Sequence, residues 1–364
     1  MSDVYAEPTT GTAPTDPATT LARYTTLRLG GPAGRLATAT TAEEIVQKVQ
    51  EAEARDEPVL VLAGGSNVVI GDQGFPGTVV LVRSRGFQVV AEDAETLTVR
   101  VEAGEPWDDL VAATVARDWS GLECLSGIPG SAGATPIQNV GAYGQEVAET
   151  IIGVQAYDRT HREVVRIEAA DCGFAYRGSI FKYSDRWVVL SVDFRLTRSP
   201  LSGPVRYAEL ARAVGVEVGD RVPLADARAT VLRLRAGKGM VLDADDPDTW
   251  SVGSFFTNPV LEREAYELLR ERAADLGEPP SWPGAGDVVK VSAAWLIDKA
   301  GFGKGHPGPE GVAISSKHTL ALTNRGGTAS TSSLVALARE IRDGVHDRFG
   351  VALHPEPVLV NCVI

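Results

Sequence analysis

The stretch that decides the fold is GIPGSAGATPIQNVGAYG, residues 127–144. Five of its eighteen residues are glycine and none is charged. Without a Cβ, the backbone N–H groups of such a segment can approach a ligand closely. Ser131, Gln138 and Asn139 add polar side chains without adding charge. A long structural loop is the plain alternative, but loops of this length without regular structure are uncommon in compact domains unless they carry function. We therefore expect a ligand site here.

A second glycine turn follows a buried strand predicted in PVLVLAGG. It is AGGSNVVIG, residues 63–71. Four consecutive residues of this turn, Gly64 to Asn67, could present their N–H groups to a phosphate. The same residues would also serve in any tight turn. The turn therefore supports a phosphate site only in combination with residues 127–144.

The composition excludes several classes of function. The chain has 364 residues, with 35 basic and 48 acidic side chains and a net charge of -13. That surface repels nucleic acid and anionic lipid. Cys124, Cys172 and Cys362 show no metal-binding spacing and are expected to be reduced thiols. We find neither a signal peptide nor an apolar run of about 18 residues that could span a membrane. We expect a cytoplasmic protein, by default a monomer.

The pattern along the chain predicts an α+β fold with at least two domains. Residues 1–20 lack large apolar side chains and are expected to form a disordered tail. Thr41 and Glu44 form a capping box at the start of a helix. Strands dominate up to about residue 198, for example IIGVQAYD and RWVVLSVDFRL, and helices such as LADARATVLRLRAG dominate after Pro200.

Three single residues could carry chemistry, and the first of them, an arginine, suits a carboxylate or an enolate. Arg177, in AYRGSIFK, carries a guanidinium group, which is planar and permanently charged. Ser254, in VGSFFTNP, is a hydroxyl in a glycine-flanked apolar turn and could donate a proton. Glu356, in LHPEPVLV, lies between prolines that fix its backbone. Taken alone, Arg177 would be interpreted as a surface arginine, Ser254 as a turn serine and Glu356 as a surface carboxylate.

Six segments, taken together, resemble the family of UDP-N-acetylenolpyruvoylglucosamine reductases, also called UDP-N-acetylmuramate dehydrogenases, in its longer form. These enzymes make the muramic acid unit of bacterial peptidoglycan. The segments occur in the family's order and span residues 21–364. They are GGSNVVI at Gly64, GIPGSAGATPIQNVGAYG at Gly127, YRGSIFK at Tyr176, GSFFTNP at Gly253, AAWLIDKAG at Ala293 and HPEP at His354.

The resemblance implies an FAD-binding fold of the vanillyl-alcohol-oxidase (PCMH) type over residues 21–198, in two subdomains split near residue 85. A C-terminal α+β substrate-binding domain would cover residues 199–364, its last residues returning toward the flavin. FAD would be bound without a covalent bond, by Gly64, Gly65, Ser66, Asn67, Val68, Gly127, Ile128, Pro129, Gly130, Gly133, Ala134, Gln138, Asn139, Gly141, Ala142 and Tyr143.

The resemblance also implies the reaction. NADPH would reduce FAD, depart, and be replaced by the enolpyruvyl UDP-sugar, whose methylene carbon would receive hydride. Arg177 and Glu356 would polarise the substrate carboxylate, and Ser254 would protonate the α-carbon. Tyr207 would stack on the uridine and Asn258 would contact the diphosphate. Further expected substrate contacts are Tyr176, Lys182, Lys238, Lys317 and His318.

Two alternatives stay open at this point. Another oxidase or dehydrogenase of the same flavin fold would often tether FAD through His or Cys, and its flavin would stay with the denatured chain. A flavin-binding protein without catalysis would keep its colour in NADPH, or its reduced form would ignore the enolpyruvyl nucleotide.

Overall fold

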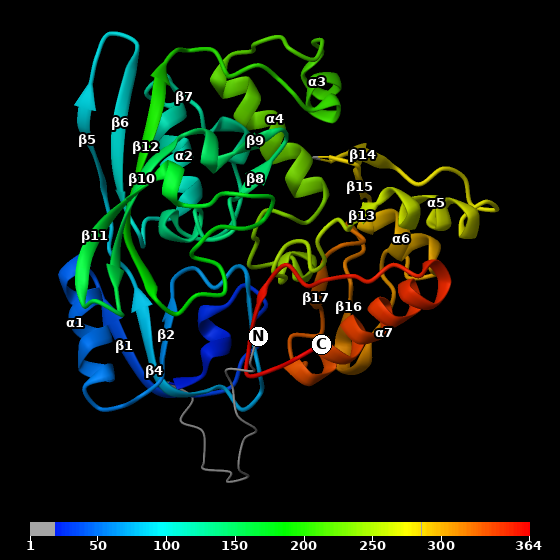
Figure 1. Cartoon of the computed structure of the whole chain (residues 1–364), viewed down its shortest axis with the longest axis horizontal. Helices are drawn as coiled ribbons and strands as arrows, with labels where there is room; N and C mark the ends of the chain where they lie inside the picture. The colour runs from blue at the N-terminus through cyan, green and yellow to red at the C-terminus, as the bar shows by residue number, and fades with distance from the viewer. Residues whose placement is uncertain (1–18, 285) are drawn as a thin grey trace. The chain divides into compact units, whose positions relative to one another are not determined.

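The computed structural model describes residues 19–284 and 286–364, which fall into two compact units (Figure 1). Unit 1 comprises Met1–Leu36, Ser66–Val79 and Asp245–Ile364, and unit 2 comprises Ala37–Gly65 and Val80–Ala244. Most of the expected N-terminal tail lies outside the described residues. The domain boundary expected after residue 198 stays a prediction.

Unit 2 is built on an antiparallel sheet in the order β11-β10-β12-β6-β5, with the short β7 added to β12. The central β12 carries the run VVLSVDF, buried on both faces, as expected of an interior strand. The edge strand β5 is mostly exposed. The strands are β5 Phe87–Glu92, β6 Thr96–Glu102, β7 Trp119–Ser120, β10 Ile151–Asp158, β11 Glu163–Glu168 and β12 Trp187–Arg198.

Helices α1 Ala42–Glu53, α2 Trp107–Val115, α3 Ala208–Val214 and α4 Leu224–Gly237 complete unit 2. The start of α1 confirms the predicted cap, because the Thr41 hydroxyl accepts the N–H of Glu44 at 3.2 Å. A three-stranded sheet has the order β1-β4-β2. Its strands are β1 Ala33–Ala39, β2 Val59–Leu62 and β4 Phe75–Val82, and the chain passes between the units within β1 and β4.

Unit 1 contains helices α5 Arg263–Arg272, α6 Ala293–Lys299 and α7 Thr331–Phe349. Helix α7 begins at the Ser330 cap and ends at Gly350 in the left-handed conformation (φ 71°), so local signals set both of its ends. Leucine, isoleucine and valine side chains of α7 are buried in the core of this unit. The mixed content of the two units agrees with the predicted α+β class.

Short strands connect distant parts of the unit 1 sequence. β18 Val358–Val360 pairs in parallel with β3 Val68–Ile70, so the chain that follows HPEP lies beside the chain that follows GGSN. The other strands are β13 Val260–Glu262, β14 Ser281–Pro283, β15 Val288–Val291, β16 Val312–Ile314 and β17 Leu322–Asn324. Within the described residues, the short 3₁₀ helices are Leu21–Tyr24, Glu123–Leu125, Ala132–Ala134, Val147–Glu149, Ala169–Asp171, Pro247–Thr249 and Pro309–Gly311.

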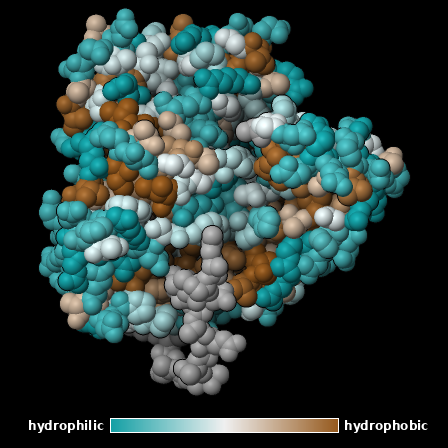
Figure 2. All heavy atoms as spheres, in the orientation of Figure 1, coloured by the Kyte–Doolittle hydropathy of each residue, from teal (hydrophilic) through white to brown (hydrophobic). Residues whose placement is uncertain are grey.

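The surface drawn in Figure 2 is mainly hydrophilic, and its hydrophobic residues form separate patches. Such scattered patches are ordinary for a folded protein. Across residues 19–284 and 286–364, we find no helix with the length and apolar character needed to cross a membrane. The three cysteines are free thiols, and burial raises the pKa of each above its usual range.

Candidate active site

The glycine stretch of residues 127–144 has a defined backbone course. It contains one 3₁₀ turn, Ala132–Ala134, and ends in a hairpin between β8 Gly141–Ala142 and β9 Gln145–Glu146. The two turn residues, Tyr143 and Gly144, both have positive φ (49° and 82°). That is the pattern of a type I′ hairpin turn. The stretch is therefore held by its own hydrogen bonds, which suits a site that has to be formed before its ligand binds.

The two glycine-rich segments meet in unit 2. A Cβ built on Gly64 would lie 2.6 Å from Cα of Gly130, so only glycine allows this approach. The hydroxyl of Ser131 is buried and makes no hydrogen bond within the described residues. A buried hydroxyl without a protein partner calls for an explanation, and a bound ligand is one. An uncharged cradle with an unsatisfied hydroxyl fits the phosphate and ring edges of FAD.

Helices α2 and α4 fix the start of the stretch. The N–H of Gly127 donates to Oδ1 of Asp108 at 2.6 Å, and Arg228 binds the same carboxylate through both ends of its fork at 2.7 and 2.8 Å. Burial raises the pKa of Asp108, but the hydrogen bonds from Arg228 and Gly127 outweigh it and hold the pKa below its usual range. The carboxylate thus stays charged and continues to accept the hydrogen bond from the N–H of Gly127.

The YRGSIFK segment is docked on the carbonyl oxygens of the glycine stretch. Ser179 Oγ donates to the carbonyl of Ile137 at 2.7 Å. The Arg177 guanidinium donates to the carbonyls of Asn139 and Gly141 at 3.3 and 2.8 Å. Lys182 Nζ donates to the carbonyl of Arg177 at 3.1 Å. Three alternate carbonyls of the expected cofactor segment therefore hold the loop, and two of them, those of Asn139 and Gly141, hold the arginine expected to polarise the substrate.

Three other expected site residues gather beside the hairpin turn. The rings of Tyr143 and Tyr207 are 5.6 Å apart at 86°, an edge-to-face contact. Lys238 Nζ lies 5.7 Å from the centre of the Tyr143 ring and 2.6 Å from Oε2 of Glu209. Burial raises the pKa of Tyr143 to about 12, which keeps its hydroxyl protonated.

Arg235 of α4 adds a buried positive charge to this part of unit 2. Its Nη2 donates to the carbonyl of Met240 at 2.7 Å, while its Nε is buried and makes no hydrogen bond to the described residues. Burial lowers the pKa of Arg235 to about 10, so the guanidinium remains charged at neutral pH.

In unit 1, the GSFFTNP and HPEP segments lie side by side. The N–H of Phe255 donates to the carbonyl of Leu320 at 2.7 Å, and the N–H of Glu356 donates to the carbonyl of Phe255 at 2.9 Å. Phe255 and Phe256 are buried in the unit 1 core, which fixes the serine that precedes them. The structure thereby brings Ser254 and Glu356 onto neighbouring strands of backbone, although they are about a hundred positions apart in the sequence.

The other expected unit 1 residues lie in GSFFTNP itself or in the turn that precedes Leu320. Asn258 Oδ1 accepts the N–H of Ala293 at 3.0 Å, which ties GSFFTNP to the start of α6. Lys317 makes an ion pair with Asp246. His318 Nδ1 accepts the N–H of Leu320 at 3.0 Å, and this histidine therefore shapes the turn that pairs with Phe255.

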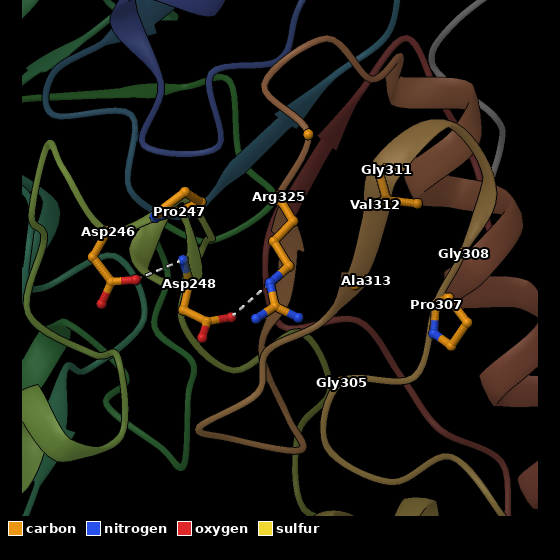
Figure 3. A pocket seen from close by; sticks show the side chains of 11 residues that line it. Asp246, Pro247, Asp248, Gly305, Pro307, Gly308, Gly311, Val312, Ala313 and Arg325 are labelled. Carbon is orange, nitrogen blue, oxygen red and sulfur yellow. Dashed lines mark hydrogen bonds and ion pairs between the residues drawn. The ribbon is translucent and has the colours of Figure 1, made fainter.

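Unit 1 also holds a pocket of about 550 Å³, whose lining contains none of the residues expected in the active site. Figure 3 shows the carboxylate of Asp248 directed at the guanidinium of Arg325, an ion pair of 3.5 Å. Asp246 bonds the N–H of Asp248 at 3.1 Å. The lining residues are Asp246, Pro247, Asp248, Gly305, Pro307, Gly308, Gly311, Val312, Ala313, Arg325 and Gly326.

The units divide the expected site residues between them. Arg177, Tyr143, Tyr207 and Lys238 are brought together in unit 2, and Ser254 and Glu356 are brought together in unit 1. Sequence reasoning missed the supporting residues Asp108, Glu146 and Arg235. Of these, only Glu146 left a local signal, since it lies two residues after Gly144, and a glycine at that place can close a hairpin.

Comparison with known proteins finds two family models in the chain. Residues 33–167 match the model of an FAD binding domain. Residues 245–360 match the C-terminal domain model of UDP-N-acetylenolpyruvoylglucosamine reductase. The crystal structure of UDP-N-acetylenolpyruvylglucosamine reductase from Thermus caldophilus has the same fold, with a TM-score of 0.64, 24% identity, and coverage of 94% of this chain and 97% of that chain.

Two curated relatives share far more of the sequence. The UDP-N-acetylenolpyruvoylglucosamine reductase of Salinispora arenicola is 78% identical over 345 residues, which cover 94% of this chain and 95% of the relative. That of Streptomyces coelicolor is 58% identical over 350 residues, covering 94% and 90%. With such identity over nearly its whole length, the chain belongs to the family of UDP-N-acetylenolpyruvoylglucosamine reductases.

Proposed function

We propose that this protein reduces UDP-N-acetyl-3-O-(1-carboxyvinyl)-glucosamine to UDP-N-acetylmuramate, with FAD as cofactor and NADPH as reductant. The observation that carries the proposal is the 78% identity over 345 residues with the reductase of Salinispora arenicola. The reaction adds one hydride and one proton across the enolpyruvyl double bond. It makes a precursor of peptidoglycan, so the enzyme serves cell-wall synthesis.

The two glycine segments would hold FAD without a covalent bond. The contact of Gly64 with Gly130 supports this assignment, as does the unsatisfied hydroxyl of Ser131. When bound, FAD would supply the hydride transfer from NADPH to the methylene carbon of the substrate. Gly127 is held by Asp108, and this contact would keep the backbone N–H groups of the stretch in place before the cofactor arrives.

Arg177 and Glu356 bind and polarise the substrate carboxylate. Hydride addition to the methylene carbon builds negative charge on the α-carbon and its carboxylate. A fixed guanidinium stabilises that charge best when it needs no reorganisation. The anchoring of Arg177 on the carbonyls of Asn139 and Gly141 supports such a role. Glu356, whose N–H is bonded to Phe255, is the second group assigned to the carboxylate.

Ser254 gives the proton to the α-carbon. Its position is fixed by the buried Phe255 that follows it and by the β-bridge between Ser254 and Ala321. A hydroxyl is a weak acid, so proton transfer requires a fixed geometry and a partner that stabilises the alkoxide. The neighbouring turn, which carries Lys317 and His318, supplies candidates for that partner.

For the nucleotide, we assign Tyr207, which contacts the Tyr143 ring edge-to-face, and the adjacent Lys238 to the uridine and diphosphate. Tyr207 is 43% exposed, which leaves ring surface for a base to stack on. Asn258 and Lys317 are assigned to the same substrate from unit 1, and Tyr176 and Lys182 from the arginine loop. We also propose that the enzyme is cytoplasmic and monomeric. Light scattering tests the monomer, whose mass is 38.5 kDa.

Product analysis tests the proposed function. The purified protein, NADPH and the enolpyruvyl nucleotide should give UDP-N-acetylmuramate, two hydrogens heavier than the substrate by mass spectrometry, with one NADPH consumed per product. A denatured sample should release its flavin into solution. Flavin that stays with the denatured chain would favour a tethered oxidase, and NADPH consumption without the heavier product would refute the proposed reaction.

A further inference from the structure

Asn139 has a side chain whose hydrogen-bonding groups are taken up by the protein. It is 2% exposed. Its Nδ2 donates to Glu146 Oε2 at 2.9 Å and to the carbonyl of Ala175 at 3.1 Å. Its Oδ1 accepts the N–H of Ala148 at 3.2 Å. A primary amide has two N–H donors, and both are used here on protein atoms. The side chain thus has no N–H left with which to bind a flavin.

These bonds tie the glycine stretch to the loop that carries Arg177. The carbonyl of Ala175 also accepts the N–H of Gly178 at 3.2 Å, and the N–H of Ala175 donates back to Gly178 at 3.0 Å. This exchange closes a tight turn in which Arg177 has a φ of 53°, a conformation that costs energy for a residue with a side chain. The bond from Asn139 therefore braces the turn at its first residue.

The same asparagine also holds the arginine side chain. The carbonyl of Asn139 accepts from Arg177 Nη1, and the carbonyl of Gly141 accepts from Nη2. Asn139 itself has a φ of 45°, which asparagine tolerates better than most residues. One residue thus fixes both the backbone of the arginine turn, through its amide, and the guanidinium, through its carbonyl.

Glu146 completes the arrangement from the hairpin strand β9. Its carboxylate accepts from Asn139, and its Cγ lies 2.7 Å from the position of a Cβ on Gly141. Glu146 pairs with Gly141 in the hairpin. The carboxylate therefore orients the Asn139 amide, and its stem packs against the residue whose carbonyl holds Arg177.

We propose that Asn139 and Glu146 are positioning residues for Arg177, and that the side chain of Asn139 does not bind FAD. This inference rests on the proposed function, because the role of Arg177 in the reaction comes from it. It replaces the cofactor contact expected for Asn139 with a structural link between the cofactor segment and the substrate-polarising arginine.

Hydrogen exchange of the loop tests the positioning directly, without any turnover. Asn139→Asp keeps the shape and the acceptor but removes both N–H donors and sets a carboxylate beside Glu146. The control is Asn324→Asp, since Asn324 is also buried and its Nδ2 donates to two main-chain carbonyls, those of Leu27 and Arg28. We expect amide exchange in residues 174–183 to become at least about tenfold faster in Asn139→Asp, as for loss of a buried hydrogen bond. The control should leave that loop unchanged.

FAD affinity and the second half-reaction complete the test. In Asn139→Asp, the Kd for FAD should stay within about threefold of wild type, while reoxidation of the reduced protein by the enolpyruvyl nucleotide slows at least about thirtyfold, because a displaced charge loses most of its stabilising effect. A large loss of FAD affinity with unchanged loop exchange would overturn the proposal, as would unchanged exchange and unchanged reoxidation.

Glu146→Ala keeps the inference testable if the asparagine variant does not fold. It removes the acceptor together with the stem that packs against Gly141, and should also speed exchange of the loop, whereas Glu146→Gln, which retains the stem and an acceptor oxygen, should restore slow exchange. Wild-type protein that is not reoxidised by the enolpyruvyl nucleotide would refute the proposed function and leave the exchange result standing. Unchanged exchange in both Asn139→Asp and Glu146→Ala would refute the positioning role even in an active enzyme.

Discussion

The guanidinium of Arg177 donates a hydrogen bond of 2.8 Å to the carbonyl oxygen of Gly141. The two residues are 36 positions apart, and Gly141 belongs to the stretch assigned to the flavin. The cation assigned to the substrate is therefore fixed to the cofactor segment within one compact unit. A site built in this way has its charge in place before substrate binds, which is the condition for electrostatic catalysis.

Arg177→Lys should separate charge from geometry. Lysine keeps the charge but has no planar fork, so it cannot donate to the carbonyls of Asn139 and Gly141 in the same way. Reoxidation of the reduced flavin by substrate should slow by roughly a hundredfold, while bleaching by NADPH changes little. Stopped-flow absorbance measures both steps. Arg195→Lys, at an exposed position on β12, is the matched control. Equal loss of both half-reactions in Arg177→Lys would count against the role assigned to Arg177.

Ser254→Ala should leave the first half-reaction nearly intact. Without its proton donor, transfer to the α-carbon should slow by about two to four orders of magnitude, the usual contribution of a general acid. Single-turnover reoxidation with the enolpyruvyl nucleotide measures the effect. Ser332→Ala changes a hydroxyl of the same unit that bonds Asp72 and should behave like wild type. A variant that still reduces substrate at the wild-type rate would remove Ser254 from the mechanism.

Gly64→Ala should weaken FAD binding. The new Cβ would lie 2.6 Å from Cα of Gly130, and backbone cannot move aside as a flexible side chain can. A clash of this kind costs about 1–3 kcal/mol, so the Kd for FAD should rise about ten- to hundredfold. Titration of the apoprotein by flavin fluorescence gives the Kd. Gly237→Ala is the control, because a Cβ there meets nothing within 4 Å. Equal affinity in the two variants would mean that this approach does not matter to the cofactor.

Much of the fold could be predicted from local signals. The helix predicted in LADARATVLRLRAG is α4, Leu224–Gly237, and the strand predicted in IIGVQAYD is β10, Ile151–Asp158. The capping box identified the start of α1. These elements are specified by residues close in sequence. Long-range pairings carry no such signal, and neither the parallel pairing of β3 with β18 nor the Asp108–Arg228 ion pair could be read from the sequence.

The family could be predicted from the sequence, but the construction of the candidate site could not. The glycines of residues 127–144 predicted an accessible backbone, and six ordered segments named the family. Composition says nothing about which way a carbonyl points, so the docking of Ser179 and Arg177 on this stretch was not foreseen. Asn139 shows the same limit, because a polar residue in a cofactor loop suggests a ligand contact until its partners are known.

The ion-pair cluster around Asp193 should make stability depend on acid pH. Arg100 binds this buried carboxylate at 2.8 Å, and Arg166 binds it as well. Burial alone would raise the pKa of Asp193, but the hydrogen bonds from the two arginines hold it below its usual range. A lowered folded-state pKa means that the stabilisation is complete above the unfolded-state pKa of about 3.9 and is lost as pH falls through the folded-state value.

Thermal unfolding from about pH 6 to pH 2.5 measures this dependence. Wild type should lose stability steeply below about pH 4. Asp193→Asn should start from a lower Tm at neutral pH, because it leaves two arginines without their partner, and should then lose less on acidification. Parallel Tm curves for the two proteins would mean that Asp193 does not contribute to the acid sensitivity.

The most direct test of the proposed function follows the flavin absorption through both half-reactions in the absence of oxygen. One equivalent of NADPH should bleach the flavin band of the wild-type protein, and UDP-N-acetyl-3-O-(1-carboxyvinyl)-glucosamine should then restore it, with one UDP-N-acetylmuramate formed per flavin. A band that stays bleached after the nucleotide is added, and returns only when oxygen is admitted, would contradict the assignment of this protein as the reductase.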